Sequence, residues 1–187
     1  MFHSRVFSTF FKMLSFTNNG TRVVLTGFMG VGKSSVARHL SALLGCERVD
    51  LDFFIEEHEQ RKIPEIIDTD GLESYREIES RNLALVLTQT HAQIISLGGG
   101  AWTEERNRIL LRKHGLTSVW LESSFQHCWH NIRMSKKERP LAKNKTAARK
   151  LFDERQKLYA LADWHFVIKP ECTSYEIARQ IAEEIFS

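Results

Sequence analysis

The stretch Gly27-Phe28-Met29-Gly30-Val31-Gly32-Lys33-Ser34 fits the pattern G-x-x-x-x-G-K-[ST] at every fixed position. Its glycines allow backbone N–H groups to turn inward around a phosphate chain. Lys33, which we expect to be exposed, brings a point charge to the β- and γ-phosphates, and the Ser34 hydroxyl can ligate Mg²⁺. A β-branched strand at 22–26 precedes the loop and an apolar helical pattern follows at 35–44. This context predicts a nucleotide-binding phosphate loop, with a chance glycine turn as the alternative.

Composition limits the class of protein. The 187 residues suit one domain with a substantial core, and 42% hydrophobic with 26% charged residues is ordinary for a globular chain. A net charge of +3 is too small to indicate nucleic-acid binding, and no apolar run approaches the ~18–20 residues of a membrane span. Cys46, Cys128 and Cys172 lack metal-ligand spacing, which favours a reducing compartment. We expect a cytoplasmic monomer without nucleic-acid or membrane partners.

The first 20 residues differ from the rest of the chain. They hold five Phe, two Lys or Arg and no acid, and the first acid is Glu47. An organelle-targeting segment and an unstructured extension both have such a composition. We expect a disordered or loosely packed extension at 1–20, followed by a single domain at 21–187.

The remaining pattern alternates strands with helices. Strands are expected at 22–26, 47–52, 93–97, 117–121 and 165–168. Helices are expected at 35–44, 53–61, 63–67, 72–88, 104–113, 147–161 and 173–186, with Ser124 able to cap a further helix and Thr173-x-x-Glu176 forming a capping box. This alternation predicts an α/β fold with a doubly wound, five-stranded parallel sheet flanked by helices.

Two of the predicted strands end in unusual residues. Ligands of such sheets bind at the carboxyl ends of the strands. Asp50 and Asp52 lie two apart, so that on an extended chain both would point the same way, one toward Mg²⁺ and one toward a substrate hydroxyl. The alternative is a helix cap at Asp52 and a solvated acid at Asp50. Three consecutive glycines at 98–100 suggest close approach of a ligand to the main chain, or else a flexible turn.

Basic residues are concentrated in one segment. The segment from Arg133 to Lys150 contains a single acid, Glu138. It contains eight basic residues, namely Arg133, Lys136, Lys137, Arg139, Lys143, Lys145, Arg149 and Lys150. Such a run is usually a solvated face, but in a kinase it can be a mobile lid that closes over ATP. Arg76, three residues before Glu79, and Arg155 would each alone be an ordinary surface charge.

Six motifs in order resemble the shikimate kinase family over about residues 22–185. They are G-F-M-G-V-G-K-S-S, D-L-D at 50–52, Y-R-E-I-E at 75–79, S-L-G-G-G at 96–100, E-R-P-L at 138–141 and R-Q-K-L-Y at 155–159. The resemblance implies a nucleoside-monophosphate-kinase-like fold. It also implies transfer of the ATP γ-phosphate to the 3-hydroxyl of shikimate, a step of aromatic amino-acid biosynthesis.

The resemblance implies where the nucleotide and metal bind. The ATP phosphates are assigned to Gly30, Val31, Gly32, Lys33, Ser34 and Ser35. Ser34 ligates Mg²⁺, and Asp50 reaches the ion through water. Arg139 approaches the phosphates from a mobile lid at about 133–146.

It likewise implies where the acceptor binds. Asp52 binds the shikimate hydroxyls and orients or deprotonates the attacking one. Arg76 and Arg155 clamp the carboxylate, for which a bidentate guanidinium is suited. The sugar-like ring lies along Gly98, Gly99 and Gly100, with Gly99 the main contact. Lys33, Asp52 and Arg139 are therefore the expected catalytic residues.

Two positions depart from the family pattern. Lys157 stands where the family usually has proline, which we expect to loosen that turn without removing Arg155. Asn131 stands where an arginine near the adenine is common, with Arg133 two residues on. The alternatives are a kinase of another acceptor, such as gluconate or a nucleotide, and a catalytically silent relative. The paired arginines with D-L-D suit a carboxylated polyol better, and a silent relative would have lost Lys33, Asp52 or Arg139.

Overall fold

A parallel sheet of five strands forms the centre of the computed structural model, which describes residues 20–135 and 137–187. The strands are β1 (Arg22–Thr26), β2 (Arg48–Asp50), β3 (Ile94–Ser96), β4 (Leu116–Glu122) and β5 (Trp164–Val167). Their spatial order is β2-β3-β1-β4-β5, and every pair is parallel. β1 lies in the middle and its Val23, Val24 and Leu25 are fully buried. The predicted doubly wound sheet is confirmed.

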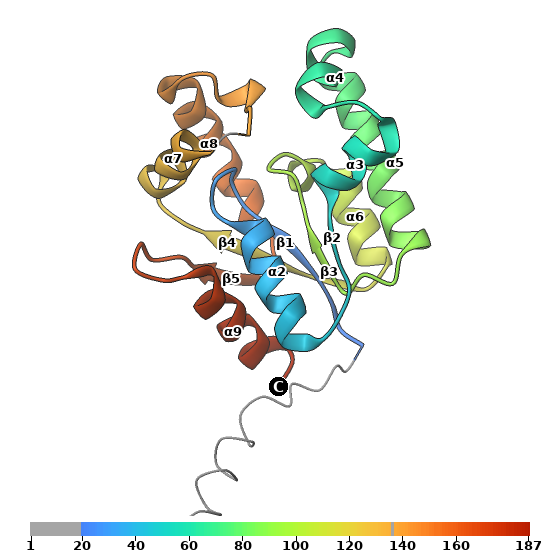
Figure 1. The fold of residues 1–187 in the computed structure, drawn as a ribbon, viewed down its shortest axis with the longest axis vertical. Helices are drawn as coiled ribbons and strands as arrows, with labels where there is room; N and C mark the ends of the chain where they lie inside the picture. The colour runs from blue at the N-terminus through green and yellow to red at the C-terminus, as the bar shows by residue number, and fades with distance from the viewer. Residues whose placement is uncertain (1–19, 136) are drawn as a thin grey trace, which may run out of the picture.

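The helices form groups around this sheet (Figure 1). α2 (Lys33–Leu44) and α9 (Ser174–Ile185) lie side by side on one face. α3 (Leu51–Glu59), α4 (Ile63–Asp70) and α5 (Leu72–Gln89) pack on one another beyond β2. The others are η1 (Ala101–Thr103), α6 (Glu105–Lys113), α7 (Phe125–Met134), η2 (Pro140–Ala142) and α8 (Lys145–Tyr159).

Local capping explains where several helices begin. The Ser124 side chain accepts the N–H of His127 at the start of α7, and Thr173 with Glu176 forms the predicted capping box. Asn144 caps α8 through the N–H of Ala147, so this helix starts two residues before the predicted 147. Capping also corrects the second strand. β2 ends at Asp50 rather than at 52, because the Asp50 carboxylate caps α3 by accepting the N–H of Phe53.

Two helical arms rise above the carboxyl edge of the sheet (Figure 1). α3 and α4 form one arm, and α7 and α8 form the other. The phosphate loop after β1 lies between them. No helix within 20–135 or 137–187 is long and apolar enough to cross a membrane. Residues 1–19 of the expected extension, and Lys136 of the basic segment, lie outside the described residues.

Candidate active site

The phosphate loop has the backbone that its glycines permit. Gly27, Gly30 and Gly32 have φ of 134°, 80° and 104°, which side-chain-bearing residues rarely adopt. A Cβ on Gly30 would also lie 2.5 Å from the Cys128 carbonyl oxygen of α7. Gly32 is the N-cap of α2, and no described side chain caps this helix. Its first N–H groups are therefore available to an anion.

Lys33 is buried, contrary to the expectation of an exposed side chain. Only 8% of it is exposed, and Nζ donates to the carbonyl oxygens of Gly27 at 2.8 Å and Phe28 at 3.1 Å. Burial lowers the pKa of Lys33 to about 8, although the nearby Asp52 carboxylate opposes this shift. No acid among the described residues forms an ion pair with this ammonium, which its hydrogen bonds hold inside the loop.

Asp50 joins three elements through one carboxylate. The Ser34 hydroxyl of α2 and the Ser96 hydroxyl of β3 both donate to Oδ2, the latter at 2.9 Å, while Oδ1 accepts the N–H of Phe53. Burial alone would raise the pKa of Asp50, but these hydrogen bonds outweigh it and hold the pKa below its ordinary value. An ionised carboxylate beside a hydroxyl offers the oxygen ligands that Mg²⁺ prefers.

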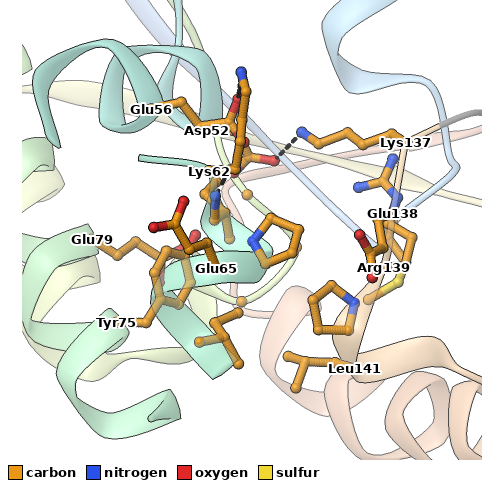
Figure 2. Close-up of a pocket in the computed structure, with 18 of the residues that line it drawn as sticks. Asp52, Glu56, Lys62, Glu65, Tyr75, Glu79, Lys137, Glu138, Arg139 and Leu141 are labelled. Carbon is orange, nitrogen blue, oxygen red and sulfur yellow. Dashed lines mark hydrogen bonds and ion pairs between the residues drawn. The ribbon is translucent and has the colours of Figure 1, made fainter. Parts of the chain in front are cut away.

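The two aspartates do not extend from one strand as expected. Asp50 caps α3 and Asp52 lies in its first turn, so the alternative with the cap at Asp52 is also wrong. The Asp52 Oδ2 accepts from Lys137 Nζ at 2.7 Å, and Figure 2 shows Lys137 reaching toward it from the segment after α7. On its other side Asp52 abuts Gly98, where a Cβ would lie 2.5 Å from Oδ1. Glycine at 98 is therefore required for this placement of Asp52.

Arg76 is the first of two buried arginines. It is 7% exposed and its Nη1 lies 2.5 Å from Glu79 Oε2 one turn later on α5. The Tyr75 hydroxyl donates to the other oxygen of Glu79 at 3.3 Å. A Cβ on Gly100 would overlap the Arg76 guanidinium. Glu79 and Gly100 thus fix where this guanidinium points.

Arg155 is the second, and it comes from α8. It is 7% exposed, and its Nη1 donates to the Gly99 carbonyl oxygen at 3.0 Å. The Tyr159 hydroxyl donates to the same oxygen at 2.5 Å. Further along, the Trp102 indole of η1 donates to the Leu158 carbonyl at 2.8 Å. The triple glycine is therefore an ordered segment that α8 holds in place, not a flexible turn.

Two adjoining cavities bring these residues together. A cavity of about 630 Å³ contains the predicted substrate residues, namely Asp52, Arg76, Gly98, Gly99, Gly100 and Arg155. A second, of about 320 Å³, contains most of the predicted phosphate and metal residues, namely Gly30, Gly32, Lys33, Ser34, Ser35 and Asp50. Val31 of the loop is buried and lines neither. Both cavities are lined by Met29, Asp50, Asp52, Gly98, Gly99, Lys137 and Arg139.

Arg139 occupies the boundary between the cavities. Its Nε is buried and has no hydrogen-bond partner among the described residues. Burial lowers the pKa of Arg139, while Asp52 and Asp50 oppose that shift. An unpaired guanidinium nitrogen at this position is ready to bind an anion.

The structure also shows the surroundings of Asn131, Arg133 and Lys157, the residues that concern the two departures from the family pattern. Asn131 Nδ2 donates to the Gly30 carbonyl at 2.8 Å and lies 3.0 Å from His127 Nε2. Arg133 is exposed and lines neither cavity. Lys157 is an exposed residue within α8, which continues to Tyr159, and Arg155 lies in the site as expected.

Sequence reasoning gave no role to three residues of the site. Lys137 contacts Asp52, Glu79 orients Arg76, and Tyr159 holds Gly99. Glu79 could have been found from its i,i+3 spacing to Arg76. Lys137 stood among many similar lysines, and only the fold selects it.

Comparison with known proteins agrees with this geometry. The sequence model described as shikimate kinase matches residues 29–186. The chain is 40% identical over 162 residues to a shikimate kinase of Streptococcus thermophilus, covering 84% of this chain and 96% of the relative. It is 38% identical over 144 residues to a shikimate kinase of Ruegeria pomeroyi, and the match covers 75% of this chain and 72% of the relative. A structure of Acinetobacter baumannii shikimate kinase in complex with shikimate superposes with a TM-score of 0.81 at 28% identity, covering 95% of this chain and 96% of that one. The chain belongs to the shikimate kinase family.

Proposed function

We infer that the protein transfers the γ-phosphoryl group of ATP to the 3-hydroxyl of shikimate, giving shikimate 3-phosphate and ADP in aromatic amino-acid biosynthesis. The observation that carries this conclusion is the pair of adjoining cavities that meet at Asp52. One contains a phosphate loop and the other contains two buried arginines. A carboxylated polyol held by the arginines would place a hydroxyl next to Asp52. Because Asp52 lines both cavities, that hydroxyl would also face the phosphates.

We propose that the phosphate side works by charge stabilisation. Lys33 and Arg139 bind the phosphate oxygens, together with the free N–H groups of α2. The Ser34 hydroxyl and the ionised Asp50 carboxylate fit a hard cation, with Asp50 acting through water. Mg²⁺ held there would neutralise charge on the β- and γ-phosphates when bound.

We propose that the substrate side works by positioning. Arg76 and Arg155 bind the carboxylate of shikimate, and the Gly98–Gly100 backbone lines the ring. Asp52 accepts the proton of the attacking hydroxyl, or orients that hydroxyl toward phosphorus. In the Acinetobacter baumannii structure the related enzyme is bound to shikimate.

We propose that residues 133–146 form a lid, on a catalytic unit of residues 21–187. The segment comprises the end of α7, η2 and the start of α8, and Arg139 projects from it into both cavities.

We further propose that the protein is a cytoplasmic monomer that binds no nucleic acid and no membrane. Its three cysteines are free, in keeping with a reducing compartment. Light scattering of the purified protein tests the monomer.

A coupled ADP-release assay tests the function, with shikimate, quinate, gluconate and AMP as separate acceptors. We expect shikimate to be the preferred acceptor and the reaction to require Mg²⁺. Equal rates with and without shikimate would show that the proposal is wrong. Faster turnover with gluconate would favour a kinase of another polyol, and inactivity with all four acceptors would favour a silent relative.

A further inference from the structure

The ion pair between Lys137 and Asp52 lies where the reaction would take place. Its Nζ and Oδ2 are 2.7 Å apart, and both residues line both cavities. The Lys137 side chain is 45% exposed and that of Asp52 18%. In Figure 2 the Lys137 ammonium reaches across the pocket from one arm toward α3 on the other. The Lys137 ammonium is thus paired with the Asp52 carboxylate, which the substrate hydroxyl must reach.

Asp52 is the fixed member of this pair. It lies in the first turn of α3, whose neighbouring Leu51 and Ile55 are fully buried, and it abuts Gly98. Lys137 is instead an exposed residue after α7, as are Ser135 and Glu138, and its ammonium extends on a flexible four-carbon chain. When a hydroxyl binds Asp52, Lys137 is therefore the residue that moves.

The cavity of about 320 Å³ is where the displaced Lys137 ammonium can bind phosphate. Lys137 lines that cavity beside Lys33 and Arg139. Lys33 is held by loop carbonyls, so it does not compete for Asp52. A bound triphosphate carries several negative charges, which outweigh a single partly solvated carboxylate as a partner for Lys137. Nucleotide binding should consequently draw Lys137 away from Asp52.

We propose that Lys137 is a catalytic residue that exchanges partners. It pairs with Asp52 when no nucleotide is bound, and it binds the oxygens of the transferred phosphoryl group when ATP and shikimate are present. This inference rests on the proposed function. In the transfer, the substrate oxygen forms a bond to the γ-phosphorus, the bond to the β–γ bridging oxygen breaks with its electrons leaving on ADP, and the hydroxyl proton passes to Asp52. Lys137 stays protonated and stabilises charge.

The exchange makes shikimate binding depend on nucleotide. Without nucleotide, shikimate competes with Lys137 for Asp52. With nucleotide bound, that competition is relieved, so shikimate binds more tightly. A surface ion pair with only a structural role would produce no such coupling between nucleotide and shikimate.

The test measures shikimate affinity by calorimetry, with and without a non-hydrolysable ATP analogue, together with kcat. Lys137→Met is compared with Lys137→Arg and with Lys143→Met, an exposed lysine of the same segment that lines neither cavity. For Lys137→Met we expect tighter shikimate binding without nucleotide, and loss of the further tightening by the analogue. We expect kcat to fall roughly 10²-fold, as for loss of one transition-state donor. Lys137→Arg should keep part of both effects, and Lys143→Met should match the parent.

Three results would overturn the inference. They are a Lys137→Met kcat within twofold of the parent, shikimate binding without nucleotide that is no tighter in that variant than in the parent, or an undiminished effect of the analogue on it. Activity of the parent enzyme with shikimate distinguishes failure of this inference from failure of the proposed function. If the parent does not phosphorylate shikimate, the function is wrong; if it does and Lys137→Met behaves like it, only the inference is wrong.

Discussion

Arg76 and Glu79 form an ion pair that is almost entirely removed from solvent, with 8% and 1% of their side chains exposed. The pair is made within one turn of α5, and Tyr75 contributes a second hydrogen bond to the same carboxylate. A guanidinium held in this way presents its remaining donors to the cavity in one fixed orientation. The shikimate recognition proposed for Arg76 and the stability of α5 therefore depend on the same arginine.

Replacing Arg76 should affect both properties. In Arg76→Ala we expect the KM for shikimate to rise at least tenfold with kcat largely spared, because the substrate carboxylate does not change charge during transfer. Leaving Glu79 buried and unpaired should destabilise the protein by about 3–5 kcal/mol. Arg76→Lys should raise KM with less loss of stability. Arg81→Ala, in an exposed pair on the same helix, is the control for steady-state kinetics and urea unfolding. An unchanged KM in Arg76→Ala would contradict the assignment.

Gly100→Ala tests the packing of Arg76 against the triple glycine. The new Cβ would overlap the guanidinium, so we expect KM for shikimate to rise by roughly the amount seen in Arg76→Ala. A double-mutant cycle provides the control. In Gly100→Ala combined with Arg76→Ala, the KM should equal that of Arg76→Ala alone. Additive effects would show that Gly100 acts on the substrate by another route.

Asp52→Asn should act on the chemical step. Asparagine keeps the shape but accepts no proton, so kcat should fall by about 10²–10⁴, the usual contribution of a positioned acid or base. Glu57→Gln, an exposed acid on the same helix, should leave kcat unchanged. Single-turnover phosphate transfer is the appropriate measurement, and a kcat within twofold of the parent would exclude Asp52 as base or orienting group.

The buried Lys33 predicts a pH dependence. Its pKa near 8 belongs to the enzyme without phosphates, and only the ammonium form attracts ATP. As pH rises through 8 the charge is lost, so kcat/KM for ATP should fall by up to about tenfold per pH unit. Bound phosphates restore the charged form, so kcat should stay level to higher pH. Lys33→Arg, which cannot deprotonate in this range, should abolish the dependence. A kcat/KM for ATP that stays level to pH 9.5 would refute it.

The lid proposal is tested by amide exchange. We expect amides in 133–146 to exchange faster without ligands than with ADP and shikimate, because phosphates that bind Arg139 would hold this segment in place. The N–H groups of β1 serve as the internal reference. Exchange in 133–146 that saturating ligands leave unchanged would count against a lid.

Most of the fold followed from the sequence because its signals are local. The phosphate-loop glycines, the Ser124 cap and the Thr173 capping box each act within a few residues. The errors arose where a polar side chain, rather than the apolar pattern, decides the local structure. Asp50 ends β2 early because its carboxylate caps α3, and the Lys33 amine is buried because it donates to the loop carbonyls of Gly27 and Phe28. No periodicity records such contacts.

The sequence could predict most of the residues that line the two cavities because ordered motifs carry them. Lys137 was missed for a physical reason: a lysine's sequence neighbours do not specify which carboxylate its long side chain reaches. Tyr159 was missed because its partner is a backbone oxygen 60 positions away.

The fastening of α8 to the triple glycine and to η1 divides that helix into two parts. Arg155, Leu158 and Tyr159 attach its C-terminal half at neighbouring points, whereas its N-terminal half packs against α7 and η2. Arg155 is therefore held through Gly99, outside the segment between Met134 and Lys145. On the proposed function, the arginine that binds the substrate carboxylate is anchored separately from the segment that carries Arg139 to the phosphates.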